Sequence, residues 1–403
     1  MAITKYLLPT IALAGSAIGQ CSNSATLTIT KSADASQIGS CTTYSGSVAI
    51  PTDVSDAQDS SGHNGLSIQG VEKIVGNVTV DSAINLASLS FPDLQEVSGL
   101  QLGGLTVLSE LSLPQIQSID RINLTALPAL QQFSFGNTGV TQSQSILITN
   151  TGLTTLKGLD KLDTINSFNV NNNPGLQNVS LGISSIKNAI RIEANNGDQN
   201  GTDASFPQLE SAMNMTFRNC SSVSLPALTN VSQYLGFYGN SFESFAAPNL
   251  STTGGLVFVE NAALSNISIP GLTTINASFQ IANNTNLKKI DGIQKLSVVT
   301  ASFDLSGNFS ELDLPNLSQV RGAFNLQTSA EFDCKPFDDA RKTKIKGKYQ
   351  CAGQQSKPGG QGTKPSSTGS GAKPTGAAGF NAVNLPALVG GTSFIAGLLQ
   401  MAL

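Results

Sequence analysis

A pair of apolar residues at positions i and i+2 recurs twelve times along this chain, at intervals of 20 to 25 residues. Alternation with period two is typical of a β-strand with one buried face, whereas an amphipathic helix needs apolar residues at i, i+3, i+4 and i+7. Repeats of this length stack so that each turn buries the apolar side of its neighbour. The pattern therefore predicts a solenoid of stacked strands. The pairs are Val78/Val80, Leu100/Leu102, Ile122/Leu124, Ile146/Ile148, Phe168/Val170, Ile190/Ile192, Met215/Phe217, Leu235/Phe237, Leu256/Phe258, Phe279/Ile281, Phe303/Leu305 and Phe324/Leu326.

A second motif lies between the pairs, of the form apolar-Pro-x-apolar with Val or Ile three residues further on. It adds a second extended segment to each turn and leaves too few residues for a helix. With about 22 residues per turn and roughly 4.8 Å between stacked strands, about twelve turns make a rod on the order of 60 Å long. We expect an all-β parallel β-helix, built as one domain over residues 20–351 with terminal caps. Examples of the motif are Phe91–Val97, Leu225–Val231, Ile269–Ile275 and Leu314–Val320.

Asparagine follows the apolar pair by two or three residues in most turns. This residue tolerates the left-handed backbone conformation of a sharp corner, and stacked amides can hydrogen-bond along the axis of a solenoid. We interpret these asparagines as corners rather than as a polar ladder that binds a ligand, because turn chemistry already explains them. They are Asn150, Asn172, Asn195, Asn219, Asn240, Asn261, Asn283 and Asn308.

The amino-terminal segment has the layout of a secretory signal peptide. Lys5 supplies a positive charge, an apolar stretch runs from Leu7 to about Ala14, and Ala17-Ile18-Gly19 is a small-x-small cleavage site before Gln20. The stretch is short and contains Pro9, so a membrane-spanning helix is disfavoured. We expect residues 1–19 to be removed and the mature protein to be secreted.

The carboxyl-terminal segment has the layout of a glycosylphosphatidylinositol (GPI) attachment signal. Residues 352–379 are rich in Gly, Ser, Thr, Pro and Gln, which predicts a disordered stalk. Residues 380–403 form an apolar tail that ends without a cytoplasmic cation, as in a signal that is cleaved when the lipid is attached. Gly376 is the best attachment residue by size, and Ser370 to Ala372 and Asn381 are alternatives.

Thirteen Asn-x-Ser/Thr acceptors for N-glycosylation lie between residues 77 and 316, and secretion makes them usable. No acceptor occurs between Asn123 and Asn178, so this stretch predicts a surface free of glycan that makes contacts. The acceptors are Asn77, Asn123, Asn178, Asn200, Asn214, Asn219, Asn230, Asn249, Asn266, Asn276, Asn283, Asn308 and Asn316.

Five cysteines fit an oxidising compartment. Cys21 and Cys41 bracket the segment before the first repeat, and Cys334 and Cys351 bracket the segment after the last one. A disulfide across a local loop of this length contributes roughly 3 kcal/mol, and it suits the caps that close the ends of a solenoid. Cys220 is left over, and we expect a buried free thiol rather than a reactive or intermolecular one.

The chain has a formal net charge of −4, but its charges are unevenly distributed. Nine of the 22 basic residues lie between positions 335 and 373. This basic segment is either a solvated cap or a contact for anionic lipid head groups or phosphorylated wall glycans. Secretion argues against nucleic acid as a partner.

The sequence contains no pattern of catalytic or metal-binding residues. The single histidine, His63, lies in a turn-rich loop without the context of a Ser-His-Asp site. Five dispersed carboxylates, Glu260, Asp291, Asp304, Glu311 and Asp313, do not occupy matching positions of neighbouring turns, as a β-helix lyase or hydrolase would require. The glycines from Gly99 to Gly104 lack the Lys and helix of a phosphate loop. We therefore predict no cofactor and no enzyme activity.

The Leu-Pro-x-Leu repeats, the strand and corner of Phe279–Asn284, the paired terminal cysteines, the many acceptors and the stalk before an anchor signal together resemble the fungal cell-wall organisation family of GPI-anchored glycoproteins, related to sporulation-specific wall proteins. The repeats are also similar to receptor L domains. The resemblance implies a right-handed parallel β-helix related to leucine-rich repeats. It further implies a non-enzymatic scaffold in wall organisation and integrity, located at the outer leaflet of the plasma membrane and in the wall.

We expect contact with wall polysaccharide or mannoproteins through a face of the solenoid, and attachment to the membrane through the GPI lipid. The resemblance supplies no catalytic residues, and it leaves the oligomeric state open. A β-helix enzyme acting on wall polysaccharide, or a surface receptor or adhesin, remains the alternative.

Overall fold

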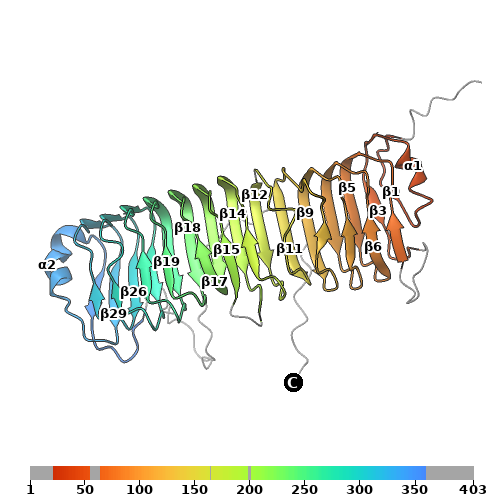
Figure 1. Ribbon diagram of the computed structural model, residues 1–403. Coiled ribbons are helices and arrows are strands. Elements are labelled where there is room, and N and C mark those ends of the chain that lie inside the picture. Colours follow the sequence, from red (N-terminus) through yellow and green to blue (C-terminus); the bar gives the residue numbers. More distant parts are fainter. Residues whose placement is uncertain (1–20, 55–63, 164, 198–200, 360–403) are drawn as a thin grey trace, which may run out of the picture.

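The computed structural model describes residues 21–54, 64–163, 165–197 and 201–359. These residues form a long rod built almost entirely from stacked short strands, with a short helix at each end (Figure 1). The strands pair in parallel, so each turn of the chain advances one step along the rod axis.

One sheet of 19 strands runs the whole length of the rod, and we call it the long sheet. Its strands are β1 (Leu27–Thr28), β2 (Thr43–Tyr44), β3 (Val48–Ile50), β5 (Lys73–Asp81), β7 (Glu96–Gly103), β9 (Ser118–Leu127), β11 (Ser145–Thr151), β12 (Ile165–Asn171), β14 (Ser185–Glu193), β16 (Ser211–Arg218), β18 (Asn230–Tyr238), β20 (Thr252–Val259), β22 (Thr274–Ile275), β23 (Phe279–Ala282), β25 (Val298–Val299), β26 (Phe303–Gly307), β28 (Gln319–Val320), β29 (Phe324–Thr328) and β30 (Tyr349–Ala352).

The twelve apolar pairs lie opposite one another in this sheet, without a slip between neighbouring turns. Val78 pairs with Leu100, Leu100 pairs with Ile122, and the register continues to Phe303 opposite Phe324. Both residues of every pair are buried. A parallel stack in register places equivalent residues above one another, so the period of the sequence becomes two continuous apolar rows inside the rod. The predicted β-solenoid is confirmed.

The stack extends beyond the twelve turns that the pairs predict, to about 14 turns. At the amino-terminal end β3 pairs with β5 and β1 pairs with β3, and at the other end β30 pairs with β29. The segments between the paired cysteines are therefore continuations of the same sheet as well as caps. The repeat was hidden at the first end because Val48 and Ile50 lie 30 residues before their partners in β5.

Shorter parallel sheets form the second side of the rod. The Pro-containing motif follows this side and leads back to the next strand of the long sheet, and its apolar residues, such as Phe91, Leu94 and Val97, are buried. The strands are β4 (Asn64–Ser67), β6 (Leu86–Ser90), β8 (Glu110–Ser112) and β10 (Phe133–Ser134); β13 (Asn178–Ser180), β15 (Thr202–Ser205) and β17 (Cys220–Ser224); β19 (Ser244–Ala246) and β21 (Asn266–Ser268); and β24 (Lys289–Ile290) and β27 (Glu311–Leu312).

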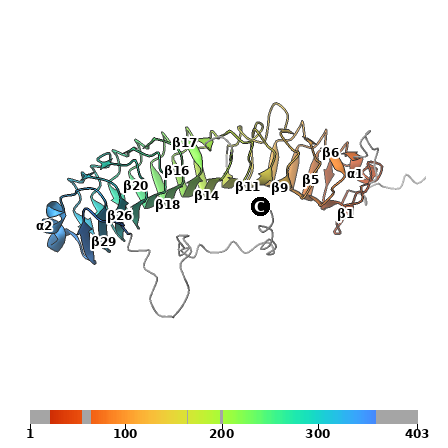
Figure 2. The same cartoon turned by 90° about the horizontal axis from the view of Figure 1, so that it is seen from below.

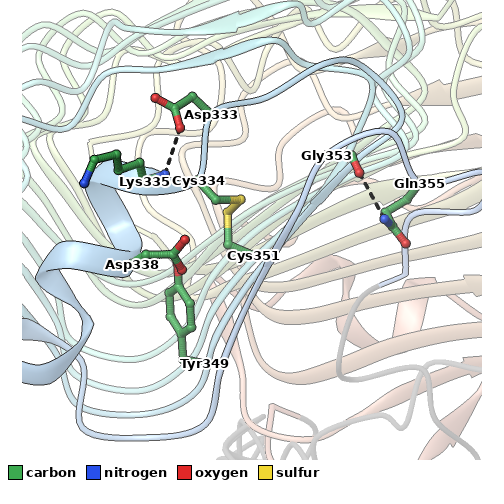
Figure 3. Close-up of a disulfide and its surroundings, with 8 residues drawn as sticks. All are labelled: Asp333, Cys334, Lys335, Asp338, Tyr349, Cys351, Gly353 and Gln355. Atoms are coloured by element: carbon green, nitrogen blue, oxygen red, sulfur yellow. Dashed lines mark hydrogen bonds between the residues drawn. A yellow bond between two sulfur atoms is a disulfide. The ribbon is translucent and has the colours of Figure 1, made fainter.

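Both ends of the rod carry a disulfide and a helix. Cys21 is bonded to Cys41 beside α1 (Ser36–Gly39), and Cys334 is bonded to Cys351 between α2 (Lys335–Lys344) and β30 (Figure 3). These are the two pairs that their positions in the sequence predicted.

The asparagines after the apolar pairs occupy two different positions. The residue two places after the pair has a positive φ in ten successive turns, from Ser82 to Asn283, and Asn150, Asn172 and Asn219 are among these corners. In the turns of Asn195, Asn240 and Asn261 the corner residue is instead Ala194, Gly239 or Glu260. The prediction that these three asparagines are corners is wrong, because each stands one residue later and is buried. Asn308 is exposed, and its φ is not positive.

Buried asparagines one place after the corner form hydrogen-bonded ladders along the rod. In one ladder Thr151 donates to Asn173, and Asn173 donates through its backbone N and Nδ2 to Oδ1 of Asn195 at 3.1 and 2.9 Å. In the other, Asn240 donates to Asn261 and Asn261 donates to Asn284 in the same way. Each Nδ2 also reaches a strand carbonyl, as from Asn261 to Phe237. The ladders satisfy polar groups that the narrow interior would otherwise bury without partners.

Candidate interaction surface

The outer face of the long sheet is the broadest regular surface of the rod, and Figure 2 shows its strands side by side along one flank. Each strand presents its alternate residues here, because the apolar pair points inward. Three outward positions per strand therefore form three rows along the rod, one before the pair, one between its members and one after it.

Glycan acceptors stand on this face at Asn77 in β5, Asn123 in β9 and Asn214 in β16. No acceptor stands on the three strands between Asn123 and Asn214, which are β11, β12 and β14. We call the outward residues of these strands the acceptor-free window. In register, its rows are Ser145, Ser167 and Ala189; Leu147, Asn169 and Arg191; and Thr149, Asn171 and Glu193.

Hydroxyl and amide groups are already linked to one another in the window. Thr149 Oγ1 donates to Asn171 Oδ1 at 2.6 Å, and Asn171 Nδ2 donates to Asn169 Oδ1 at 2.8 Å. Each of these side chains is half-buried and retains contact with solvent. Fixed amides and hydroxyls that keep free bonding capacity are suited to a polyhydroxylated ligand, since each can both donate and accept.

Two tyrosines, Tyr234 and Tyr238, lie on the outer face on β18, separated from the window by β16, which carries Asn214. A Cβ atom placed on Gly255 of the next strand would lie 2.5 Å from the ring of Tyr234, and one placed on Gly236 would lie 2.7 Å from the ring of Tyr238. The rings therefore occupy space that only glycine leaves open. Arg218 stacks over Tyr238 at 5.1 Å from the ring centroid and reaches Glu193 at 3.9 Å. Burial raises the pKa of Tyr238, which stays a neutral phenol.

Sequence reasoning did not find this tyrosine cluster, although its residues are close together in the chain. Tyr234, Leu235, Gly236, Phe237 and Tyr238 are consecutive. The inward pair and the outward tyrosines are all large or apolar, so the contrast that marks an exposed face is absent. The alternation of glycine with tyrosine on the outward positions is the signal that was available.

Among the other described acceptors, Asn230 begins β18 of the long sheet, and the rest lie on the second side or in connecting segments. Asn178 and Asn266 begin strands of the second side, and Asn249 and Asn316 follow the proline of the recurring motif. Most acceptors are exposed, whereas Asn77, Asn214, Asn219 and Asn230 are half-buried. Their occupancy stays a prediction.

Cys220 is a buried free thiol. Burial raises its pKa to about 12, with the nearby carboxylates of Asp203 and Glu193 acting in the same direction. The neutral thiol is a poor nucleophile, because the thiolate is the reactive form.

Three of the five carboxylates singled out in the sequence have separate partners in the structure. Glu311 pairs with Lys289 at 2.8 Å, Asp313 accepts from Gln294 at 2.6 Å, and Asp304 accepts from Asn325 at 2.7 Å. Glu311 and Asp313 line an open cleft of about 460 Å³ between the last turns and α2, with a largely apolar floor that includes Phe332 and Phe337. Two of the five carboxylates that the sequence shows as dispersed thus line one cleft, and each already has a partner.

Within the described ranges, no group of three or more His, Cys, Asp or Glu side chains has the arrangement of a metal site. None of the helices in those ranges has the length and apolar character needed to cross a bilayer. The signal peptide, His63, Asn200, the stalk beyond residue 359, Gly376 and the apolar tail lie outside the described residues.

Comparison with known proteins gives a consistent set of relatives. The family model described as Ecm33, a GPI-anchored cell wall organization protein, matches residues 1–39. A cell surface GPI-anchored protein of Arthroderma benhamiae is 42% identical over 362 residues, which cover 89% of each chain. Protein ecm33 of Aspergillus fumigatus is 39% identical over 89% of this chain and 88% of its own. Sporulation-specific protein 2 of Saccharomyces cerevisiae is 28% identical over 72% of this chain and 54% of its own. No solved structure matches.

Proposed function

Because this chain belongs to the Ecm33 family of GPI-anchored cell wall organisation proteins, we propose that it is a non-enzymatic scaffold that binds wall polysaccharide or mannoprotein through the acceptor-free window. The family places it outside the cell, at the outer leaflet of the plasma membrane and in the wall. None of the relatives named above carries the name of an enzyme. The proposal assigns the interaction to one face of the rod.

The observation that carries this proposal is the order of glycan acceptors across the long sheet. Four strand spacings separate Asn123 on β9 from Asn214 on β16, which is about 19 Å at roughly 4.8 Å per spacing. Glycans attached at these two asparagines would flank the window without covering it. A gap of this width accommodates an extended saccharide chain or a protein segment.

The chemistry of the window supports a sugar-rich ligand. Its centre offers the linked side chains of Asn169, Asn171 and Thr149, and its edge offers the charged pair of Arg218 and Glu193. On the far side of β16 and Asn214, Tyr234 and Tyr238 add amphipathic surface to the same face, with an apolar body and a polar tip. The combination resembles a wet, polar interface rather than an apolar docking groove.

A single substitution tests this assignment in cells. Leu147→Asn creates an Asn-Ile-Thr acceptor in the centre of the window, because Ile148 and Thr149 follow it. Glu110→Asn is the matched control, since it creates Asn-Leu-Ser at the start of β8, the position that Asn178 and Asn266 hold in their own turns. Leu147→Gln controls for loss of the leucine without an added glycan.

We expect cells that carry Leu147→Asn to lose resistance to wall stress, and cells that carry either control to retain it. Mass spectrometry confirms that the new acceptors are occupied. Full resistance with a glycan at position 147 would overturn the proposal. If cells without the protein have a normal wall, and the purified protein binds a defined ligand, the receptor or adhesin alternative holds instead. Release of new sugar ends from wall polysaccharide by the purified protein would favour the enzyme.

A further inference from the structure

The carboxyl-terminal end of the rod carries a concentration of positive charge that the rest of the rod lacks. Five cations, Arg341, Lys342, Lys344, Lys346 and Lys348, fall within eight residues of α2 and the loop to β30. By contrast, residues 21–334 contain twelve basic residues against 24 acidic ones. The rod is therefore electrically polar along its axis. We call Lys342, Lys346 and Lys348, which are exposed, the basic tip.

The basic tip is held on a rigid support. The disulfide between Cys334 and Cys351 joins the start of α2 to β30, as Figure 3 shows. Ile345, between the lysines, is buried, and the ring of Tyr349 stacks on that of Phe324 at 5.3 Å. Because the backbone is fixed on both sides, the lysines cannot move away from the end of the rod together.

The neighbouring carboxylates are already engaged. Asp339 pairs with Lys335 at 2.8 Å, and Asp338 accepts a hydrogen bond from the hydroxyl of Tyr349 at 2.8 Å. Arg341 stacks over the ring of Tyr349. Within the part of the chain that the structure describes, no carboxylate forms a salt bridge with a lysine of the basic tip. Their charge is directed to solvent.

The chain also leaves the rod at this end. Gly359 is held to β29 by hydrogen bonds with Gln327, at 3.2 Å, and with Asn325, at 2.9 Å. Seventeen residues, 360–376, separate this point from the predicted attachment residue. A Gly/Ser-rich linker of this length has a root-mean-square span of about 21–25 Å, which is the span expected if the stalk predicted from composition is correct. The lipid anchor would therefore keep the basic tip close to the bilayer.

We propose that the basic tip binds phosphate-bearing lipid head groups of the membrane that carries the anchor, and that the rod consequently stands on its carboxyl-terminal end. The acidic remainder of the rod is repelled by the same surface, so attraction and repulsion favour one orientation. The rod axis then points away from the membrane, and the acceptor-free window on its side faces the space that wall polymers occupy.

The test uses the mature glycoprotein released from cells by a phospholipase, so that no lipid remains on it. Co-sedimentation measures its binding to vesicles of phosphatidylcholine, with and without phosphatidylinositol. The test variant replaces Lys342, Lys346 and Lys348 with Gln. The control variant replaces Lys31, Lys157 and Lys161, three exposed lysines outside the basic tip and the acceptor-free window, with Gln, and so makes the same change in charge.

We expect binding only to the anionic vesicles, and a loss on the order of 100-fold in the test variant, since each lysine near an anionic surface contributes a factor of roughly five. The control variant should bind as wild type does. Equal loss in both variants, or equal binding to both vesicle types, would overturn the proposal. So would binding to phosphorylated mannan in place of vesicles. Should the test variant fail to fold, the wild-type protein still decides, because binding at the basic tip must fall as salt is raised.

Discussion

Cys220 occupies in its own turn the position that Asn240 occupies in the next, and its backbone N donates to Oδ1 of Asn240 at 2.8 Å. It thus ends the second asparagine ladder. Its thiol lies 3.9 Å from the carbonyl of Ile192, where the ladder asparagines place a strong Nδ2 donor. In the first ladder Asn195 accepts two bonds from Asn173. A cysteine at position 220 has no amide oxygen with which to accept the equivalent two bonds from Asn195, so the two ladders remain separate.

The residues that follow position 220 explain why asparagine is absent there. Ser221 and Ser222 come next, so an asparagine at 220 would itself be a glycan acceptor, Asn-Ser-Ser. A glycan added before folding is incompatible with burial. None of the five ladder asparagines, Asn173, Asn195, Asn240, Asn261 and Asn284, begins an acceptor sequence.

Joining the ladders should therefore stabilise the protein once the acceptor is removed. We expect Cys220→Asn combined with Ser222→Ala to be more stable than Ser222→Ala alone by about 1–2 kcal/mol, because two buried hydrogen bonds are gained. The midpoint of urea denaturation measures this. Cys220→Asn alone should instead acquire an extra glycan and be secreted poorly. A double variant no more stable than its Ser222→Ala parent contradicts the ladder explanation.

The thiol of Cys220 also predicts a pH dependence of stability. Burial raises its pKa to about 12 in the folded protein, whereas an unfolded cysteine titrates near 8.5. The stabilising contribution is therefore complete below about pH 8.5 and is lost as pH rises towards 12. At pH 10 the wild type should have lost about 2 kcal/mol relative to pH 7, compared with Cys220→Ser over the same range. Parallel curves for the two proteins would show that the thiol is accessible to water.

Breaking a ladder should cost more than removing an exposed asparagine. Asn261 accepts from Asn240 and donates to Asn284 and to the carbonyl of Phe237. Asn261→Ala leaves these buried groups without partners, and we expect a loss of about 2–4 kcal/mol. Asn286→Ala, an exposed change in the next turn, should alter stability by less than about 0.5 kcal/mol. Similar urea midpoints for the two variants would rule out a structural role for the ladder.

The carboxyl-terminal disulfide should act locally. In a solenoid each turn contacts only its neighbours. Replacing both Cys334 and Cys351 with Ser should therefore loosen β30 and α2 and leave the middle of the rod unchanged. The chain-entropy contribution of a loop of this length is roughly 3 kcal/mol. Hydrogen exchange measured by mass spectrometry should rise in residues 335–352 and stay constant in β12. Uniform acceleration along the whole rod would contradict this independence of turns.

The apolar pairs could be predicted from the sequence because parallel stacking repeats one environment at one interval. The same logic failed for the asparagines, since corner and ladder positions are adjacent and both accept Asn, as at Asn172 and Asn173. A corner with a left-handed φ and a ladder position with a buried amide both favour asparagine, so the residue type alone does not distinguish them. The turn formed by Val48 and Ile50 was missed because a longer connection interrupts the period before β5.

The candidate surface could be predicted only in part. The gap between acceptors at Asn123 and Asn178 indicated the region, but the register of the long sheet was needed to show that the gap on the outer face extends to Asn214. The fit of Tyr234 over Gly255 depends on two strands that are neighbours in space, and no spacing within one strand reveals it.

Binding of the phospholipase-released protein to fractionated wall polysaccharides and mannoproteins tests the central claim most directly. The claim requires that wild type and Glu110→Asn be retained by the same wall fraction and that Leu147→Asn, with a glycan in the acceptor-free window, pass through. Equal retention of all three proteins would show that the ligand is held elsewhere on the rod and would contradict the account.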